Sequence, residues 1–163
     1  MKRVLFVCLG NICRSPAAEG VFLHQLTQAG AADRFLVDSA GTGGWHVGKA
    51  ADPRMRAAAS QRGIALTSRA RQLELSDLDR FDHILTMDAA NLAHVQALAR
   101  EGRSCAAAGA HGQQARIEPL VGYCSRFDAH EVPDPYYGGE EGFEQVLDLL
   151  EDACTGLLQA LDR

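Results

Sequence analysis

The chain has 163 residues, a length that fits one ordinary domain able to bury most of the apolar surface of its unfolded chain. Its composition, 47% hydrophobic and 23% charged, is that of a globular protein and excludes a disordered or fibrous one. The formal net charge of −5 argues against nucleic acid as the main partner, because binding to a phosphate backbone depends on clustered Lys and Arg.

Targeting signals and cysteine usage favour a cytoplasmic protein. No apolar run is long enough to cross a bilayer, and the apolar stretch after Lys2 and Arg3 is too short for a signal peptide. The five cysteines have no zinc-ligand spacing and do not form the framework of a small secreted domain. We therefore expect reduced thiols, no metal and no membrane insertion, while secretion without a signal peptide stays open.

The first half of the chain alternates strands with helices. The run RVLFVC at 3–8 predicts a strand buried on both faces, and helix start and stop signals follow it over 15–30. FLVDSAGT at 35–42 predicts a second strand. The segment 52–63 then predicts a helix with Asp52 as its N-cap and a proline in the first helical position.

The second half continues the same alternation. FDHILTM at 81–87 predicts a third strand, after which Asp88 caps a helix. RIEPLVGY at 116–123 predicts a fourth strand, with Pro119 marking an edge or a strand end. The tail from residue 140 onward predicts an amphipathic helix.

Strands that alternate with helices are typical of βαβ units, in which helices cover both faces of a mostly parallel sheet. We therefore predict an α/β fold with three layers, as a single domain over residues 1–163. The small and polar stretch 104–115 has no clear period and predicts a surface loop.

The strongest functional signal is CLGNICRS, which joins the first strand to the first helix. Ligands of such sheets bind beyond the carboxyl ends of the strands, where free amides of a turn and a helix start form an anion site. Gly10 and Asn11 tolerate the backbone conformation that a tight turn needs, and Arg14 can hold two oxygens of a tetrahedral oxyanion. We predict a phosphate-binding loop made of Leu9, Gly10, Asn11, Ile12, Cys13 and Arg14.

Cys8 is predicted to lie at the bottom of this loop, where amide dipoles and a guanidinium favour the thiolate at neutral pH. A thiolate beneath a bound phosphoryl group is a nucleophile, which indicates transfer through a cysteinyl-phosphate. Ser15 is placed to donate a hydrogen bond to that thiolate when it becomes a leaving group. A nucleotide-binding P-loop fits poorly, since the lysine and two glycines of its motif are absent.

Breaking a phosphate ester also requires a proton for the departing oxygen, and VPDPYYGG supplies a candidate donor. Asp134 lies between two prolines, which limit backbone motion and could hold the carboxyl over a distant loop. Tyr136 and Tyr137 add flat, amphipathic walls suited to an aromatic substrate ring. Taken alone this segment predicts a proline-rich turn, so its weight comes from its pairing with the phosphate-binding loop.

Together, VCLGNICRS and DPYYG resemble motifs of the low-molecular-weight protein tyrosine phosphatase family. DSAGTGGWHVG, ADPR, RARQL and FDHILTMD follow between them in the expected order, so the resemblance covers essentially the whole chain. It implies a four-stranded parallel sheet of phosphatase-I or flavodoxin-like topology, flanked by helices. It also implies a bacterial enzyme without cofactors that hydrolyses phosphotyrosine in proteins.

The resemblance implies catalytic roles for three residues. Cys8 would be the nucleophile, Arg14 the phosphate clamp, and Asp134 the acid in the first step and the base toward water in the second. Trp45 would line the substrate cleft together with Tyr136. The implied partners are phosphotyrosine-containing proteins, tyrosine kinases among them, and phosphate-like oxyanions would act as inhibitors.

Supporting roles are implied in the same way. Asn11 and Ser39 would hydrogen-bond to hold the loop in its shape, and Asp88 would orient Arg14 in addition to capping a helix. One departure is Ser68, which stands where the family often has a histidine tied to this network.

Cys13 has two interpretations. It can fill space under the loop, or it can form a disulfide with Cys8 on oxidation and so spare the nucleophile from irreversible oxidation. The ring closed by such a bond would be small, and the bond therefore strained and easily reduced.

Three alternative functions remain open at this point. A thioredoxin-coupled arsenate reductase would need two further cysteines, for which Cys105 and Cys124 are the mid-chain candidates, although their spacing is wide. A protein-arginine phosphatase tends to have threonine at the position of Ile12 and to lack the paired tyrosines. A catalytically dead phosphotyrosine-binding module would not need Asp134.

Overall fold

The structure, a computed structural model, describes residues 1–105 and 114–163. Its four strands form one parallel sheet in the order β2-β1-β3-β4. The strands are β1 (Lys2–Cys8), β2 (Phe35–Gly41), β3 (His83–Thr86) and β4 (Arg116–Pro119). The helices are α1 (Arg14–Gln28), α2 (Pro53–Ser60), α3 (Asp77–Arg80), α4 (Ala89–Cys105) and α5 (Glu140–Leu161), with 3₁₀ turns η1 (Ala32–Arg34) and η2 (Leu120–Tyr123).

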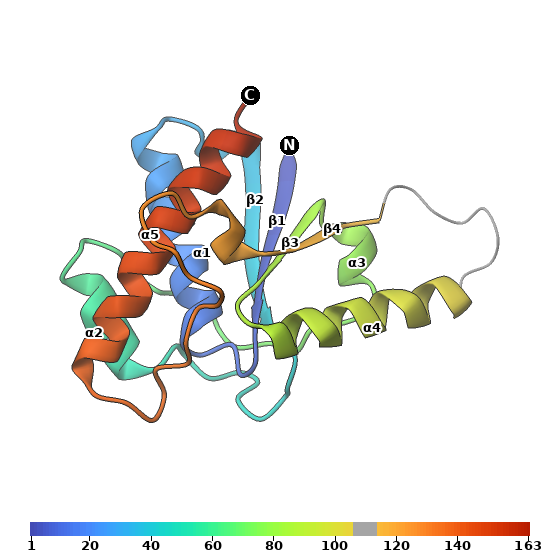
Figure 1. The fold of residues 1–163 in the computed structure, drawn as a ribbon, viewed down its shortest axis with the longest axis horizontal. Helices are drawn as coiled ribbons and strands as arrows, with labels where there is room; N and C mark the ends of the chain where they lie inside the picture. The colour runs from blue at the N-terminus through green and yellow to red at the C-terminus, as the bar shows by residue number, and fades with distance from the viewer. Residues whose placement is uncertain (106–113) are drawn as a thin grey trace.

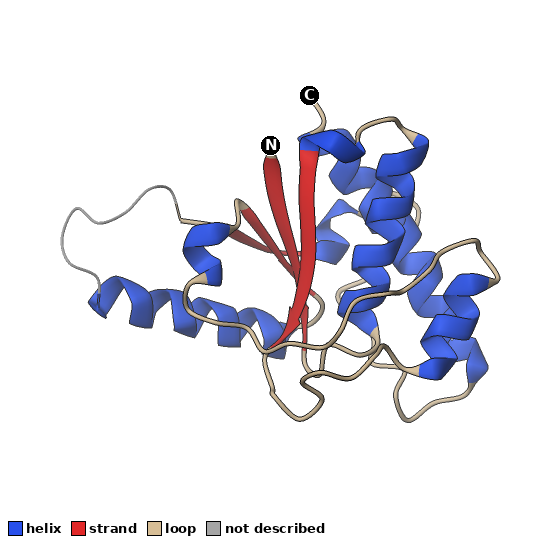
Figure 2. Cartoon of the chain, turned by 180° about the vertical axis from the view of Figure 1, so that it is seen from behind, coloured by secondary structure: helices blue, strands red, loops and turns tan. Residues whose placement is uncertain are grey.

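The sheet is the middle of three layers, as the sequence predicts. Figure 1 shows α1 and α5 on one side of the strands and α3 and α4 on the other, and Figure 2 shows the same division from behind. The strand order, which reverses between β1 and β3, is that of a doubly wound, flavodoxin-like sheet. Such a sheet binds ligands at the carboxyl ends of the strands next to the reversal.

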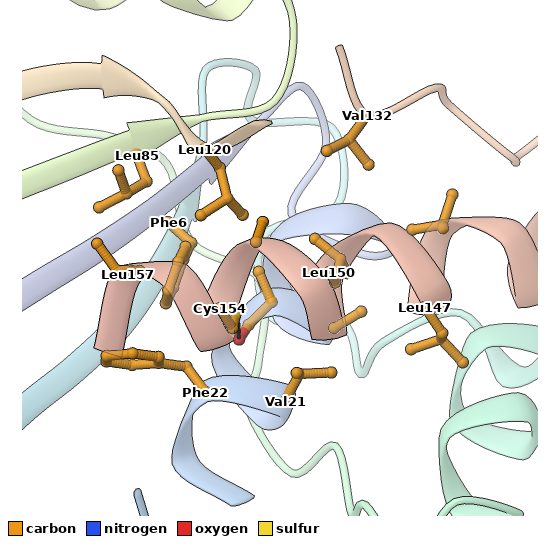
Figure 3. Close-up of a cluster of buried hydrophobic side chains, with 14 of the residues drawn as sticks. Phe6, Val21, Phe22, Leu85, Leu120, Val132, Leu147, Leu150, Cys154 and Leu157 are labelled. Carbon is orange, nitrogen blue, oxygen red and sulfur yellow. Dashed lines mark hydrogen bonds between the residues drawn. The ribbon is translucent and has the colours of Figure 1, made fainter. Parts of the chain in front are cut away.

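The larger apolar core lies between the sheet and the pair α1 and α5 (Figure 3). Phe6 from β1 meets Phe22 from α1 edge to face, with 5.7 Å between the ring centroids. Leu147 and Leu150 bring the apolar stripe of α5 into the same core, where both are fully buried. A second core, on the α3 and α4 side of the sheet, includes Ile84. Both faces of the central strands are therefore covered, which fixes the strand ends in space.

Local sequence signals explain where several elements begin and end. Asp52 caps α2 by accepting a hydrogen bond from the backbone N–H of Arg54 at 2.8 Å. Gly30 follows α1 with φ +66°, the left-handed conformation that ends many helices. Pro119 ends β4, because it has no N–H to continue the ladder.

The predicted fourth strand over 116–123 is too long. Only Arg116–Pro119 joins the sheet, at its edge, and Leu120–Tyr123 forms a 3₁₀ turn that places Leu120 in the core. The four-residue helix α3 was not among the predicted elements. The loop predicted over 104–115 lies largely outside the described residues.

The carboxyl edge of the sheet is the end that positions the site. Cys8 is the last residue of β1 and pairs in register with Gly41, the last residue of β2. The N-terminus lies at the opposite end of β1 (Figure 1). Segments that follow β1, β2 and β3 therefore meet at one edge, although they are far apart in sequence.

Candidate active site

A cleft of about 430 Å³ opens at this edge. Three chain segments line it: the loop after β1, the loop after β2, and the segment that precedes α5. The lining residues are Cys8, Leu9, Gly10, Ile12, Cys13, Arg14, Trp45, His46, Asp134, Tyr136 and Tyr137. All of these except His46 are residues that the sequence motifs single out.

Cys8 lies at the base of the cleft with 2% of its surface exposed. Its Sγ is 3.0 Å from Ser15 Oγ and accepts a hydrogen bond from the backbone N–H of Asn11 at 3.3 Å. Ser15 Oγ accepts a hydrogen bond from Asn11 Nδ2 at 2.7 Å, and its own hydrogen can point at the sulfur, 3.0 Å away, or at the Ala40 carbonyl, 3.5 Å away. This set of donors suits a negatively charged sulfur.

The backbone of the loop has a shape that few residues permit. Asn11 has φ +57°, and among the residues that the structure describes no other residue except glycine has a positive φ. Gly41 lies against the loop so closely that a Cβ there would come within 2.8 Å of Leu9 O and 3.1 Å of Asn11 N. Since both contacts are with backbone, the glycine of DSAGT is required for the loop to pack on β2.

The Asn11 side chain ties the loop to two other elements. Its Nδ2 donates to Ser39 Oγ on β2 at 3.0 Å, and its Oδ1 accepts from the backbone N–H of Arg71 at 3.0 Å. Ser39 Oγ in turn donates to Glu19 Oε1 on α1 at 2.6 Å. The side chains of Asn11 and Ser39 are both buried, so these bonds are shielded from water.

Glu19 is a half-buried carboxyl at the end of this network. Burial is the largest influence on its pKa and raises it, although hydrogen bonds from Ser39 and Ser68 act in the opposite direction. Ser68, the residue that departs from the family pattern, therefore still contacts the network. Sequence reasoning assigned no role to Glu19 or Arg71, although Arg71 lies in the RARQL motif, because a motif alone does not show which side chain or backbone group contacts the loop.

Arg14 is the first residue of α1, and its guanidinium is 3% exposed. Its Nη1 donates to Asp88 Oδ2 at 2.7 Å and to the carbonyl of Val132 at 3.0 Å. Asp88 uses its other oxygen to cap α4, accepting from the backbone N–H of Asn91 at 2.8 Å. Asp88 therefore contacts the arginine and caps the helix at once.

The segment around Asp134 lines the same cleft as the phosphate-binding loop. Asp134 Oδ2 lies 3.7 Å from Arg14 Nη2, and its Oδ1 accepts a hydrogen bond from the backbone N–H of Tyr136 at 3.1 Å. The Asp134 side chain is 41% exposed. A carboxyl, a guanidinium and a thiol thus share one cleft, although 126 positions of sequence separate Cys8 from Asp134.

Aromatic side chains form the mouth of the cleft. Trp45 is 69% exposed, and Tyr136 and Tyr137 meet edge to face with 4.9 Å between their centroids. His46, which sequence reasoning missed, lies with its ring 6.4 Å from that of Tyr136 and within 3.0 Å of where a Cβ on Gly10 would stand. Its position next to Trp45 in a loop predicted to line the cleft is the signal that could have found it.

The described residues contain neither a metal-binding group of side chains nor a membrane-spanning helix. Among residues 1–105 and 114–163, no three His, Cys, Asp or Glu side chains are grouped so that they could hold a metal ion. In the same part of the chain, every helix is too short or too polar to span a bilayer. What the cleft does offer is amide, guanidinium and hydroxyl donors around a thiol, a set that suits an oxyanion.

The fold and the cleft define an α/β protein with a cysteine-containing, oxyanion-binding loop after its first strand. Comparison with known proteins gives the family. The family model for low molecular weight phosphotyrosine protein phosphatases matches residues 3–163. The chain belongs to this family, and it is an enzyme of the protein-tyrosine-phosphatase class.

Individual relatives span nearly the whole chain. A putative low molecular weight protein-tyrosine-phosphatase of Synechocystis is 44% identical over 99% of this chain and 97% of its own. The crystal structure of a protein tyrosine phosphatase from Entamoeba histolytica, with Hepes in its active site, is 39% identical and has a TM-score of 0.89, covering 99% of this chain and 97% of that one. A Drosophila arginine phosphatase is 30% identical, with a TM-score of 0.88, and covers 100% of this chain and 99% of that one.

Proposed function

We propose that this protein hydrolyses phosphotyrosine in proteins, and small aryl phosphates, through a cysteinyl-phosphate intermediate. The observation that carries the proposal is the convergence of Cys8, Arg14 and Asp134 in one cleft whose mouth is aromatic. A nucleophile, an anion clamp and a proton donor are the three groups that metal-free hydrolysis of an aryl phosphate requires.

In the first step, the phosphoryl group lies on the amides of the loop with two oxygens on the Arg14 guanidinium. The sulfur of Cys8 attacks phosphorus, an S–P bond forms, and the P–O bond to the aryl oxygen breaks. The electron pair of that bond goes to the aryl oxygen, which takes the proton of the Asp134 carboxyl and leaves as a phenol.

In the second step, water attacks the phosphorus of the cysteinyl-phosphate. Asp134, now a carboxylate, takes a proton from that water, the S–P bond breaks, and the electron pair returns to sulfur. Ser15 Oγ, 3.0 Å from Sγ, and the amide of Asn11, 3.3 Å away, stabilise the departing thiolate. Inorganic phosphate leaves and the loop is regenerated.

The residues around this centre have supporting roles. Asn11 and Ser39 hold the loop in shape through the bonds described above, and Asp88 orients Arg14. Trp45 and Tyr136 form the walls for the substrate ring. Ile12 is apolar, so it is a better neighbour for an aromatic ring than for the guanidinium of a phosphoarginine substrate. Phosphate-like oxyanions compete for the same loop.

Cys13 is the proposed redox partner of Cys8. Peroxide oxidises the Cys8 thiolate to a sulfenic acid and leaves as hydroxide, and the Cys13 thiolate then attacks that sulfur, forming a disulfide and displacing the sulfenic oxygen as a second hydroxide. Burial, and the nearby Asp52 to a lesser degree, raise the pKa of Cys13 to about 12. Few Cys13 thiolates exist at neutral pH, so we expect disulfide formation to accelerate as pH rises. Thiols that must stay reduced for catalysis fit a cytoplasmic location.

An arsenate reductase relay has less support. Cys124, one of its two candidate cysteines, is not among the residues that line the cleft, and burial raises its pKa to about 11. A high pKa makes a thiol a poor relay nucleophile at neutral pH. The arginine-phosphatase alternative differs from the proposal in its substrate, so comparing phosphotyrosyl and phosphoarginyl peptides distinguishes the two.

The test is phosphate release from a phosphotyrosyl peptide in EDTA, with the matching phosphoarginyl peptide in parallel. We expect wild type to hydrolyse the phosphotyrosyl peptide, Cys8→Ser to be inactive, and the control Cys124→Ser to match wild type. Faster hydrolysis of the phosphoarginyl peptide would show that phosphoarginine, not phosphotyrosine, is the preferred substrate. Activity in Cys8→Ser would exclude the cysteinyl-phosphate, and loss of activity in Cys124→Ser would favour the relay.

A further inference from the structure

Arg54 has an ordered set of partners that the proposed chemistry does not use. It is the second residue of α2, and its side chain is 44% exposed. An arginine this exposed is usually solvated, and a single surface ion pair stabilises little. Arg54 instead contacts three parts of the molecule: the N-cap of α2, the segment that carries Asp134, and α5.

The first contact is with Asp52, the N-cap of α2. Arg54 Nε donates to Asp52 Oδ1 at 3.1 Å and Nη2 donates to Oδ2 at 2.9 Å, so the guanidinium is held as a planar fork. The backbone N–H of Asp52 donates to the carbonyl of Ile12 at 2.8 Å. Arg54 is therefore anchored to the phosphate-binding loop through one buried residue.

The second contact is with the segment that carries Asp134. Arg54 Nη2 donates to the carbonyl of Tyr136 at 2.9 Å, and the guanidinium carbon lies 5.5 Å from the centre of the Tyr136 ring. The third contact is with α5, where the same carbon lies 4.8 Å from the centre of the Phe143 ring. Phe143 is 1% exposed, so this surface is fixed in the core.

Tyr136 links these contacts to the carboxyl. Its carbonyl accepts from Arg54, and its N–H donates to Asp134 Oδ1 at 3.1 Å. An oxygen that accepts an amide hydrogen bond favours the proton on the other oxygen. That oxygen, Oδ2, is the one that lies 3.7 Å from Arg14, inside the cleft.

We propose that Arg54 is a positioning residue for the general acid: by holding the Tyr136 carbonyl to the N-terminus of α2, it sets which oxygen of Asp134 carries the proton and where that oxygen points. The inference rests on the proposed function, in which Asp134 protonates the leaving group. It adds that the acid is aligned by a residue that never touches the substrate.

The experiment compares kcat/KM of Arg54→Met for two substrates. Methionine keeps the apolar stem of the side chain and removes every donor. A phosphotyrosyl peptide needs a proton on its leaving oxygen, whereas 2,4-dinitrophenyl phosphate, whose leaving group is a stable anion, does not. Because a general acid contributes about 10²–10⁴-fold, partial misalignment should lower kcat/KM about ten-fold for the peptide and less than about two-fold for the dinitrophenyl ester.

Three further single variants and one double variant complete the design. Asp134→Asn should show the same substrate dependence with a larger loss, and adding Arg54→Met to it should cause little further loss. Arg54→Lys, which keeps one donor for the Tyr136 carbonyl, should lose less than Arg54→Met. Arg56→Met is the matched control, because Arg56 is on the same helix and donates to the carbonyl of Ala51 instead.

The outcomes separate this inference from the proposed function. An equal loss on both substrates, a change confined to KM, or no loss in Arg54→Met would overturn the positioning role. Inactive wild type, or Asp134→Asn without a leaving-group dependence, would instead overturn the proposed function. If Arg54→Met does not fold, the Arg54→Lys comparison decides: a uniform loss on both substrates contradicts the inference.

Discussion

The two halves of the cleft are built in opposite ways. The polar side chains of the phosphate-binding half are buried, with Cys8, Asn11 and Arg14 exposed by 2%, 3% and 3%. Asn11 bonds to β2 and α1, and Arg14 bonds to the start of α4. The segment that carries Asp134 is exposed by 41% at that residue and by 94% at Tyr137. This segment is held by a few hydrogen bonds, such as those of the Tyr136 carbonyl with Arg54 and of the Tyr136 N–H with Asp134.

The difference matches what each half has to do. Donors for an anion act best when they are fixed before the anion arrives, because then no reorganisation is needed at the moment of reaction. A group that must meet leaving groups of different shape, and later a water molecule, can sit on a segment with more freedom. Changes in the loop should therefore cost both stability and turnover, and changes in the acid segment should cost turnover or binding alone.

The largest effect is expected from Arg14→Lys. A lysine keeps the charge but loses the planar fork, and transition-state arginines in phosphoryl transfer contribute about 10³–10⁵-fold. We expect kcat/KM for a phosphotyrosyl peptide to fall about 10³-fold. Steady-state kinetics measure it, with Arg56→Lys as the control on a neighbouring helix. A fall below about ten-fold would mean that charge alone holds the phosphate.

Cys13→Ser tests whether the loop protects its own nucleophile. After a pulse of peroxide followed by a thiol reductant, wild type should regain most of its activity, because the disulfide is reducible. The variant should regain little, since the Cys8 sulfenic acid goes on to sulfinic acid. Recovery is measured relative to the initial activity of each protein. Equal recovery in the two proteins would remove Cys13 from this role.

Asn11 tests the rigidity of the loop through stability. Asn11→Gly permits the φ of +57° but leaves buried partners unsatisfied, which should lower the free energy of unfolding by about 1–3 kcal/mol. Asn11→Ala adds the strain of a left-handed residue and should cost about 1 kcal/mol more. Urea unfolding of both variants gives the difference. An alanine variant as stable as the glycine variant would show that the loop relaxes.

Glu19→Gln gives a pH-dependent effect. Burial raises the pKa of Glu19, so the folded state binds its proton more tightly than the unfolded state does. The free energy of unfolding of wild type therefore falls as pH rises from the ordinary carboxyl range through the raised pKa. Glutamine has no such proton, so the stability of the variant relative to wild type should increase over that interval. Parallel pH profiles in urea unfolding would contradict this.

The smallest effect on folding is expected in the acid segment. Tyr137 is 94% exposed, so Tyr137→Ala should change the free energy of unfolding by less than about 0.5 kcal/mol. The loss of an aromatic wall should raise KM for a phosphotyrosyl peptide a few-fold while kcat stays the same. A destabilisation as large as that of Asn11→Gly would erase the contrast between the two halves.

Much of this architecture could be predicted from the sequence, because its signals are local. The alternation of strands and helices, the cap at Asp52 and the left-handed Asn11 all depend on neighbouring residues. The end of β4 depends on where Pro119 meets the edge of the sheet, and 116–123 alone does not show it. Local patterns therefore predict elements better than they predict boundaries.

The site divides in the same way. Its motifs identify the residues that face the cleft, and the family resemblance identifies which distant motif faces which. Glu19, Arg71 and Arg54 were given no role, because each contacts a backbone group or a buried side chain that only the folded chain brings near. Arg54 and Arg71 lie in the motifs ADPR and RARQL, but the motifs do not show what these side chains contact.

Asp88 carries a consequence for the dynamics of the protein. One of its oxygens accepts from the backbone N–H of Asn91 and the other accepts from Arg14, so a single carboxylate links the first turn of α4 to the anion clamp, which the Val132 carbonyl also holds. Fraying of that turn would remove one of the two partners of Arg14 Nη1, and an oxyanion bound to the arginine would oppose the fraying by mass action. We therefore expect amide hydrogen exchange at the start of α4, a helix that does not line the cleft, to slow when the cleft is occupied.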